Sequence, residues 1–165
     1  MPSRKYGIKT ELKKWFAGAE KIVVAGVGNP IRMDDFVGVK IVQELQGKVS
    51  EKVFLIECET VPESFIQQIA EFGPTHVLLI DAAIIGLKPG EPRLVETSTL
   101  EKTPAFSTHT LPLRIFCEYL RRTTNAQIGL LVIQPEKTEF GEGLTQQLAA
   151  SAMHVTQILQ RLLPS

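Results

Sequence analysis

Residues 21–30 read KIVVAGVGNP, an apolar and largely β-branched run that ends in a glycine-asparagine-proline turn. A strand that is covered on both faces by helices has this character, because neither face meets water. From Phe36 onward, apolar residues recur with helical spacing until Gly47. The stretch therefore predicts a βα unit in which residues 21–27 form a central strand.

The same alternation continues along the chain. Strand 92–97 follows strand 76–81 with no helix between them, so we expect it to be antiparallel to the others. Alternating strands and short helices predict an α/β fold with a mostly parallel sheet. The other expected elements are strands at 53–56 and 128–133, helices at 62–72, 111–122 and 142–163, and an opening amphipathic helix on Ile8, Leu12, Trp15 and Phe16.

Composition bounds the class of protein. The 165 residues are 44% hydrophobic and suit one domain, 1–165, with 1–20 as a helical extension. Eighteen basic and eighteen acidic residues give a formal net charge of zero, which argues against nucleic acid or an anionic membrane as the partner. Cys58 and Cys117 have no paired spacing and are expected to be buried free thiols. With no export signal and no apolar run of about twenty residues, we expect a soluble, cytoplasmic protein. We also expect it to be a monomer.

Polar residues collect where ligands bind in open α/β sheets, beyond the carboxyl ends of the strands. The acidic pair Asp34-Asp35 follows the first strand, and Asp81 ends strand 76–81. His109 stands where the helix feeding strand 128–133 begins, which is the same edge. Two carboxylates and an imidazole from three loops would suit a divalent transition metal.

Each of these residues also has a structural interpretation. Asp34 or Asp35 can cap the helix that begins near Phe36, and because neighbouring side chains point differently, one can cap while the other faces the cleft. Asp81 can be an ordinary turn residue, and His109 alone is more often a helix-start histidine than a ligand. We expect His76 and His154 to be structural.

Other catalytic motifs are missing. The third glycine of a dinucleotide-binding GxGxxG would fall at Ile31, so the glycines of 26–30 are better explained by a tight strand exit. The chain has no GxSxG, no HExxH and no cysteine beside a histidine. Adjacent Asp34 and Asp35 cannot readily face each other as a protease dyad, whereas Asp35 and Asp81 can.

Several motifs in order resemble the hydrogenase maturation endopeptidases, over about residues 21–150. The hydrogenase-3 type is most similar, because its acidic pair is Asp-Asp. The motifs are GVGNP (26–30), DDFVG (34–38), LIDAA (79–83), GLKPG (86–90), THTLPL (108–113), IQP (133–135) and GEGL (141–144).

The resemblance implies a three-layer, phosphorylase/hydrolase-like α/β/α sandwich with five strands. It further implies an aspartic-type endopeptidase that removes the C-terminal extension of a nickel-iron hydrogenase large-subunit precursor, and only after nickel is loaded. The metal-contacting residues of the family correspond to Asp35, Asp81 and His109. Phe36 departs from the family's small residue, and Cys58-Glu59-Thr60 stands in place of its glycine-rich turn, which bears on substrate choice.

The resulting hypothesis is that nickel arrives on substrate thiolates, so that no tightly held cofactor is expected. Asp35, Asp81 and His109 complete its coordination, and Asp35 or Asp81 activates water. Asn29, Thr108 and Arg114 are candidates for binding the substrate. Asn29 can equally hold its own loop, and Arg114 can be a solvated helix residue.

Two other functions remain open at this point. A peptidyl-tRNA hydrolase also has an early strand ending in Gly-Asn-Pro, but its Thr-Arg-His-Asn segment is absent and the neutral charge suits tRNA poorly. A docking or nickel-delivery protein would use Asp35, Asp81 and His109 only to recognise a loaded partner. Incubation with nickel-loaded precursor separates these functions from the protease, which alone shortens the precursor.

Overall fold

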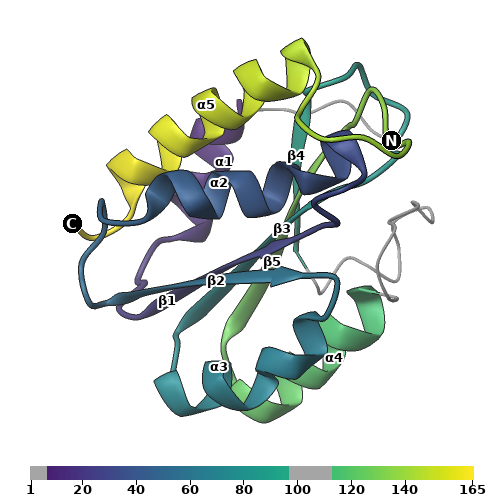
Figure 1. Cartoon of the computed structure of the whole chain (residues 1–165). Coiled ribbons are helices and arrows are strands. Elements are labelled where there is room, and N and C mark those ends of the chain that lie inside the picture. Colours follow the sequence, from purple (N-terminus) through teal and green to yellow (C-terminus); the bar gives the residue numbers. More distant parts are fainter. Residues whose placement is uncertain (1–6, 97–112) are drawn as a thin grey trace.

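The computed structural model describes residues 7–96 and 113–165, and its centre is a five-stranded sheet (Figure 1). The strand order is β2-β1-β3-β5-β4. Four strands are parallel, and β4 pairs antiparallel with β5, as the sequence predicts. The strands are β1 Ile22–Val27, β2 Val53–Glu59, β3 His76–Ala82, β4 Pro92–Glu96 and β5 Gln127–Ile133.

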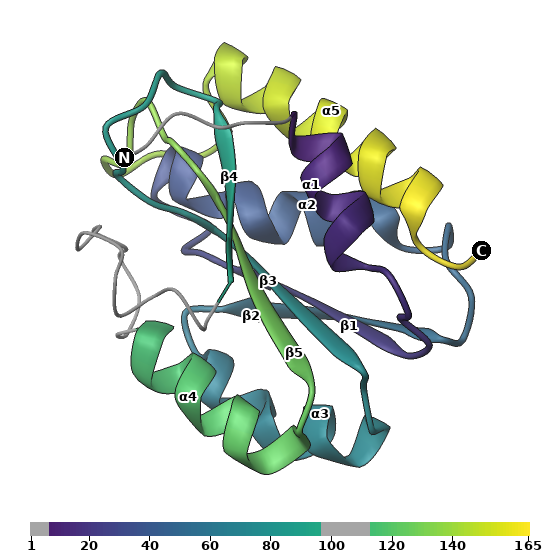
Figure 2. The same cartoon turned by 180° about the vertical axis from the view of Figure 1, so that it is seen from behind.

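Helices cover both faces of the sheet and make the expected three-layer α/β/α sandwich. One layer contains α1 Ile8–Trp15, α2 Val37–Leu45 and α5 Gln146–Leu162. The other contains α3 Ile66–Phe72 and α4 Leu113–Thr124, which lie together below the sheet in Figure 2. Short 3-10 helices, η1 Met33–Phe36 and η2 Pro62–Phe65, lead into α2 and α3. β1 and β3 are buried along their whole length, as strands between two helical layers must be.

Three expected boundaries differ from the structure by three residues or more. The closing helix begins at Gln146 rather than at 142, because Gly141 and Gly143 adopt positive φ values that a helix does not contain. The helix expected from Pro62 starts as the 3-10 turn η2, and strand β2 continues to Glu59. The beginning of helix 111–122 and the end of strand 92–97 lie outside the described residues.

Helix α2 lies directly on the sheet because glycine occupies the points of closest approach. A Cβ atom on Gly38 would overlap the carbonyl oxygen of Ile80, and one on Gly26 would overlap that of Gly38. Gly28, with φ 148°, likewise leaves no room for a side chain beside the Asp35 carbonyl. These glycines therefore bring the start of α2 against the ends of β1 and β3.

The remaining structural expectations concern buried single residues. Cys58 and Cys117 are free and buried. His76 packs edge-on against Trp15, with ring centroids 5.0 Å apart, and is structural as expected. In the described part of the chain, no helix combines the length and apolar character that crossing a membrane requires.

Candidate active site at the carboxyl edge of the sheet

The loop after β1 places Asp35 at the carboxyl edge of the sheet. Asp35 lies in η1 and is fully buried. Its Oδ2 accepts a 2.8 Å hydrogen bond from the backbone N–H of Asn29. The Asn29 Oδ1 in turn accepts the N–H of Ile31 at 3.0 Å, so Asn29 holds its own loop. The carboxyl group is thus oriented by the turn that ends the strand.

Asp34 has a different task from its neighbour. It is also fully buried, but its carboxylate accepts the backbone N–H groups of Glu136, Lys137 and Thr145 at 2.7–3.0 Å. The Thr145 hydroxyl donates to both of its oxygens, at 2.8 and 3.0 Å. Asp34 therefore ties the segment between β5 and α5 to the loop after β1.

Neither aspartate caps α2, which corrects one of the structural interpretations. The residue at the cap position is Phe36, and no side chain bonds to the first turn. The 3-10 turn that contains both aspartates starts the helix instead. The two neighbouring aspartates therefore differ in role: Asp34 holds a loop, and Asp35 lies at the carboxyl end of β1.

Asp81 lies at the end of β3 on the same edge. Its side chain is fully buried, and Oδ1 accepts the N–H of Ala82 at 2.8 Å. The segment beyond it is fastened to β5, since Ala83 donates to the Ile133 carbonyl at 3.1 Å. Asp81 is thus a buried acid on a rigid element, which an ordinary exposed turn residue is not.

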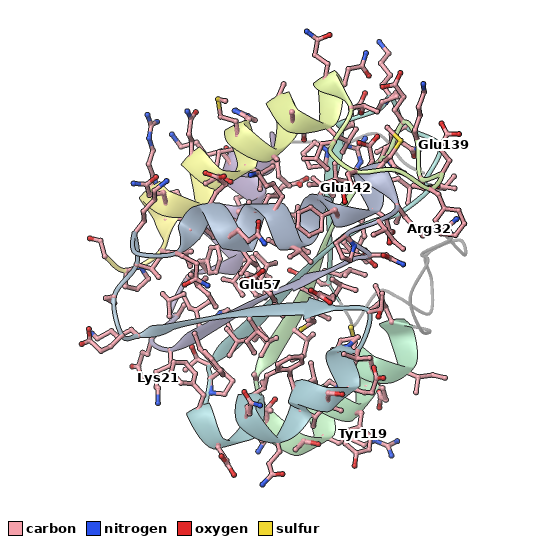
Figure 3. The ribbon with its side chains drawn as sticks, viewed as in Figure 1. Lys21, Arg32, Glu57, Tyr119, Glu139 and Glu142 are labelled. Atoms are coloured by element: carbon pink, nitrogen blue, oxygen red, sulfur yellow. The ribbon has the colours of Figure 1, made fainter. Side chains whose placement is uncertain are left out.

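The close packing of α2 brings Asp35 and Asp81 to one place in the fold. Gly38 lies three residues after Asp35, and Ile80 directly precedes Asp81; these two backbones are in contact. In Figure 3 this end of the molecule is marked by Arg32, Glu139 and Glu142, opposite Lys21 at the amino ends of the strands. The structure thus places the segments that carry Asp35 and Asp81 against each other at the carboxyl edge, and the joint role of the two side chains stays a prediction.

The third predicted ligand lies outside the described residues. That ligand is His109, and Thr108 lies outside the described residues as well. Arg114 lies in α4, but its side chain is not described. Within 7–96 and 113–165, no three His, Cys, Asp or Glu side chains form a group able to hold a metal. The metal site composed of Asp35, Asp81 and His109 stays a prediction.

The two thiols are unsuited to nucleophilic chemistry. Burial raises the pKa of Cys58 to about 12, and the nearby charge of Glu63 adds to the effect. Burial alone raises the pKa of Cys117 to about 12. Neither group is a thiolate near neutral pH, so carboxylates are the better candidates for the chemistry.

Two further features of this edge become visible in the structure. Glu59, at the end of β2, has φ 51° and stands where the resembled family has a glycine-rich turn. The Arg32 guanidinium lies 4.9 Å from the centroid of the Phe140 ring, joining segments more than a hundred residues apart in the chain. The glycine departure is a signal that could have pointed to Glu59, whereas no local signal pairs Arg32 with Phe140.

Comparison with known proteins agrees with this architecture. The family model described as hydrogenase maturation protease matches residues 39–162, most of the chain. This chain belongs to the hydrogenase maturation protease family. A relative from Methanocaldococcus jannaschii is 36% identical over 129 residues, covering 73% of this chain and 76% of the relative. The hydrogenase 3 maturation protease of Escherichia coli K12 is 29% identical, covering 84% of this chain and 88% of that protein.

A solved structure extends the likeness to three dimensions. The crystal structure of the nickel-iron hydrogenase maturation protease HycI from Thermococcus kodakarensis matches with a TM-score of 0.85 and 33% identity. The match covers 93% of this chain and 98% of the other. As a hydrogenase maturation protease, the chain is a hydrolase whose family implies a hydrogenase large-subunit substrate.

Proposed function

We propose that this hydrogenase maturation protease removes the C-terminal extension of a nickel-loaded hydrogenase large-subunit precursor, and that it recognises the precursor by its nickel. The observation that carries the proposal is the placement of two buried carboxylates, Asp35 and Asp81, at one edge of the sheet. Buried acids are uncommon in proteins, and they are found preferentially at functional sites. Family membership supplies the reaction class, and these two residues supply a place for it.

Nickel enters this proposal as part of the substrate. It arrives bound to thiolates of the precursor, and Asp35, Asp81 and His109 complete its coordination. Imidazole and thiolate suit nickel better than magnesium or calcium, and carboxylates add negative charge. The backbone N–H groups of Asn29 and Ala82, which bond to the two carboxylates, keep them oriented before the substrate binds.

The proposed chemistry is hydrolysis by an activated water molecule. Asp35 or Asp81 accepts a proton as the water oxygen attacks the carbonyl carbon of the scissile peptide bond. The proton then passes to the departing nitrogen, and the carbon–nitrogen bond breaks. Anchoring the precursor beside the acids favours this step, because positioning alone can lower a barrier by roughly 7 kcal/mol.

Three further residues are proposed to hold the substrate chain. The Asn29 side-chain oxygen already accepts Ile31 N–H, so its NH₂ group is the part that would donate to a substrate carbonyl. Thr108 and Arg114 flank His109 in the chain and would bind the peptide near the metal. The same loop thus orients Asp35 and presents a donor to the substrate.

The decisive experiment incubates the purified protein with nickel-loaded precursor and follows the precursor mass. We expect loss of the extension with nickel and no cleavage without it. The variants Asp35→Asn, Asp81→Asn and His109→Ala should leave the precursor uncut while keeping the wild-type circular dichroism spectrum. His154→Ala, on the exposed side of α5, is the matched histidine control and should cleave normally.

Each alternative function has its own outcome in this assay. Precursor that binds and is never shortened would indicate a docking protein, and release of peptide from peptidyl-tRNA would indicate an esterase. Normal trimming by His109→Ala would contradict recognition through nickel.

A further inference from the structure

Four exposed apolar side chains surround the edge that carries Asp35 and Asp81. They are Ile31 and Ile84, each 50% exposed, Val61 at 44% and Phe140 at 75%. Each follows a different parallel strand, namely β1, β3, β2 and β5, so all four lie beyond carboxyl ends. The other large apolar side chains exposed in the described residues, Ile115, Tyr119 and Met153, lie on the helices α4 and α5.

Arg32 adds a positive charge to this surface. Its guanidinium lies against the Phe140 ring, 4.9 Å from the centroid. Among the described residues, its buried Nε has no hydrogen-bond partner, and no carboxylate forms an ion pair with the guanidinium. A guanidinium offers five N–H donors in a fixed plane, so Arg32 is suited to donate hydrogen bonds to a carboxylate of another molecule.

The backbone holds these side chains in place in advance. Gly141 accepts the N–H of Met33 at 3.2 Å and donates to the carbonyl of Ile31 at 3.0 Å. The buried carboxylate of Asp34 joins the same two loops, because it accepts hydrogen bonds from backbone N–H groups of the segment after β5. Ile31, Arg32 and Phe140 therefore need little ordering on contact with a partner, which raises the affinity that a given contact area provides.

We propose that the apolar rim, defined as Ile31, Arg32, Val61, Ile84 and Phe140, is the docking surface for the folded part of the hydrogenase large-subunit precursor. The proposal rests on the proposed function. The matching surface of the precursor is apolar and carries an acidic side chain opposite Arg32. Aromatic and arginine side chains supply much of the binding energy in protein interfaces, and Phe140 with Arg32 provides both.

The location of the apolar rim around Asp35 and Asp81 favours the precursor, rather than a second copy of this chain, as the partner that binds there. A protease must admit its substrate to Asp35 and Asp81, so whatever reaches these residues also meets the rim. A second copy seated there would cover the two acids. Docking of this kind holds the precursor equally before and during the reaction, so it should act on KM rather than on kcat.

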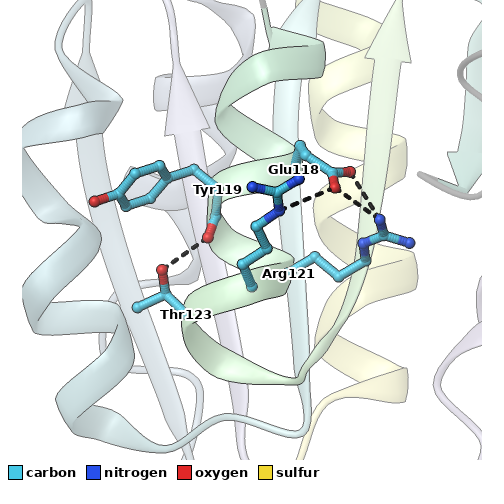
Figure 4. Close-up of polar contacts among 5 residues, drawn as sticks. Glu118, Tyr119, Arg121 and Thr123 are labelled. Carbon is cyan, nitrogen blue, oxygen red and sulfur yellow. Dashed lines mark hydrogen bonds and ion pairs between the residues drawn. The ribbon is translucent and has the colours of Figure 1, made fainter.

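The test compares rim variants in steady-state processing of nickel-loaded precursor. Phe140→Ser and Arg32→Glu should each raise KM about 10-fold or more, while kcat stays within about two-fold of wild type. Tyr119→Ser is the matched control: Tyr119 is 59% exposed on α4, beside Glu118 and Arg121 in Figure 4, and its loss should leave KM unchanged. Thermal melting of each variant confirms that its fold is retained.

Direct binding distinguishes this proposal from the proposed function. The Kd of precursor for wild type and Phe140→Ser, measured by calorimetry, should differ by about 10-fold even for precursor lacking nickel. If wild type binds precursor and never cuts it, the proposed function is contradicted, whereas the rim is still supported as the docking surface. If Phe140→Ser and Arg32→Glu bind and cleave like wild type, or if they only abolish dimerisation of the protease, the rim proposal is overturned.

Discussion

The two ends of the sheet differ in the side chains that they bury and expose. At the carboxyl edge, three fully buried aspartates lie under loops that expose apolar side chains. At the amino edge, His76 is buried against Trp15 and Phe16, and exposed charged side chains lie nearby, as at Lys21 in Figure 3. The carboxyl end buries three carboxylates and exposes four large apolar side chains beside its charged ones, whereas the amino end buries an imidazole among aromatic rings. The difference indicates that the carboxyl edge is arranged for contact with another molecule.

The largest expected effect tests whether Asp34 holds the carboxyl edge together. Asp34→Ala leaves three backbone N–H groups and the Thr145 hydroxyl without their acceptor, so the free energy of unfolding should fall by about 4 kcal/mol. Thr145→Val removes only the hydroxyl contacts and should lower it by about 1 kcal/mol. Urea denaturation measures both, and equal stabilities for the two variants would contradict the assignment.

The second prediction concerns the contact that brings the two acids to one place. Gly38→Ala places a methyl group on the carbonyl oxygen of Ile80 and should lower the free energy of unfolding by about 3 kcal/mol. Processing of precursor should fall as well, because a displaced α2 moves the preceding η1, and Asp35 with it, away from Asp81. Gly7→Ala, where a Cβ meets nothing within 4 Å, should change stability by only about 0.5 kcal/mol.

The third prediction concerns the amino edge and tests how the free energy of unfolding depends on pH. Burial lowers the pKa of His76 below its ordinary value of 6.5. The unfolded chain then binds a proton more readily than the folded one, so this stability is present above pH 6.5 and is lost as pH falls toward the folded-state pKa. His76 therefore makes the stability rise with pH over this interval, because the unfolded chain releases its proton as the pH increases.

His76→Gln should flatten that slope in urea titrations between pH 5 and 7.5. Identical slopes for the variant and wild type would show that His76 does not carry the effect. The variant should still process precursor, because His76 begins β3, at the end of the strand away from Asp81.

The smallest expected effect compares two residues in the left-handed region, one at each edge. Glu59→Gly should raise the free energy of unfolding by about 0.5 kcal/mol, because the relief of strain at φ 51° slightly exceeds the entropy that glycine loses. Asn125→Gly, at φ 58° near the amino edge, should change it by less than about 0.3 kcal/mol, since asparagine tolerates this region. A loss of stability for Glu59→Gly would contradict strain at the carboxyl edge.

Most of the fold is readable from local sequence. Strands β1 and β3 are continuous apolar runs, and α1 and α2 show helical spacing, because burial between two layers leaves a pattern within each element. The antiparallel return of β4 follows from the missing helix before it. The pattern predicts the start of α5 too early, because Gly141 and Gly143 adopt positive φ values and Asp34 holds their segment outside the helix.

The sequence by itself predicts only part of the candidate site. That Asp81 ends a strand, and that an acidic pair follows another, can be seen in the chain itself. Which acid of the pair faces the edge cannot, because Asp34 and Asp35 are chemically identical neighbours. Their difference depends on Thr145 and its neighbours, which arrive more than a hundred residues later.

Local patterns thus determined the order of strands and helices, the parallel sheet and the edge where acids collect, because hydrophobic periodicity acts over a few residues. Tertiary packing decided which aspartate became a support, how closely α2 approaches β3, and that Arg32 lies on an exposed Phe140. Those outcomes depend on contacts between distant segments, and such contacts exist only once the sheet has brought the segments together.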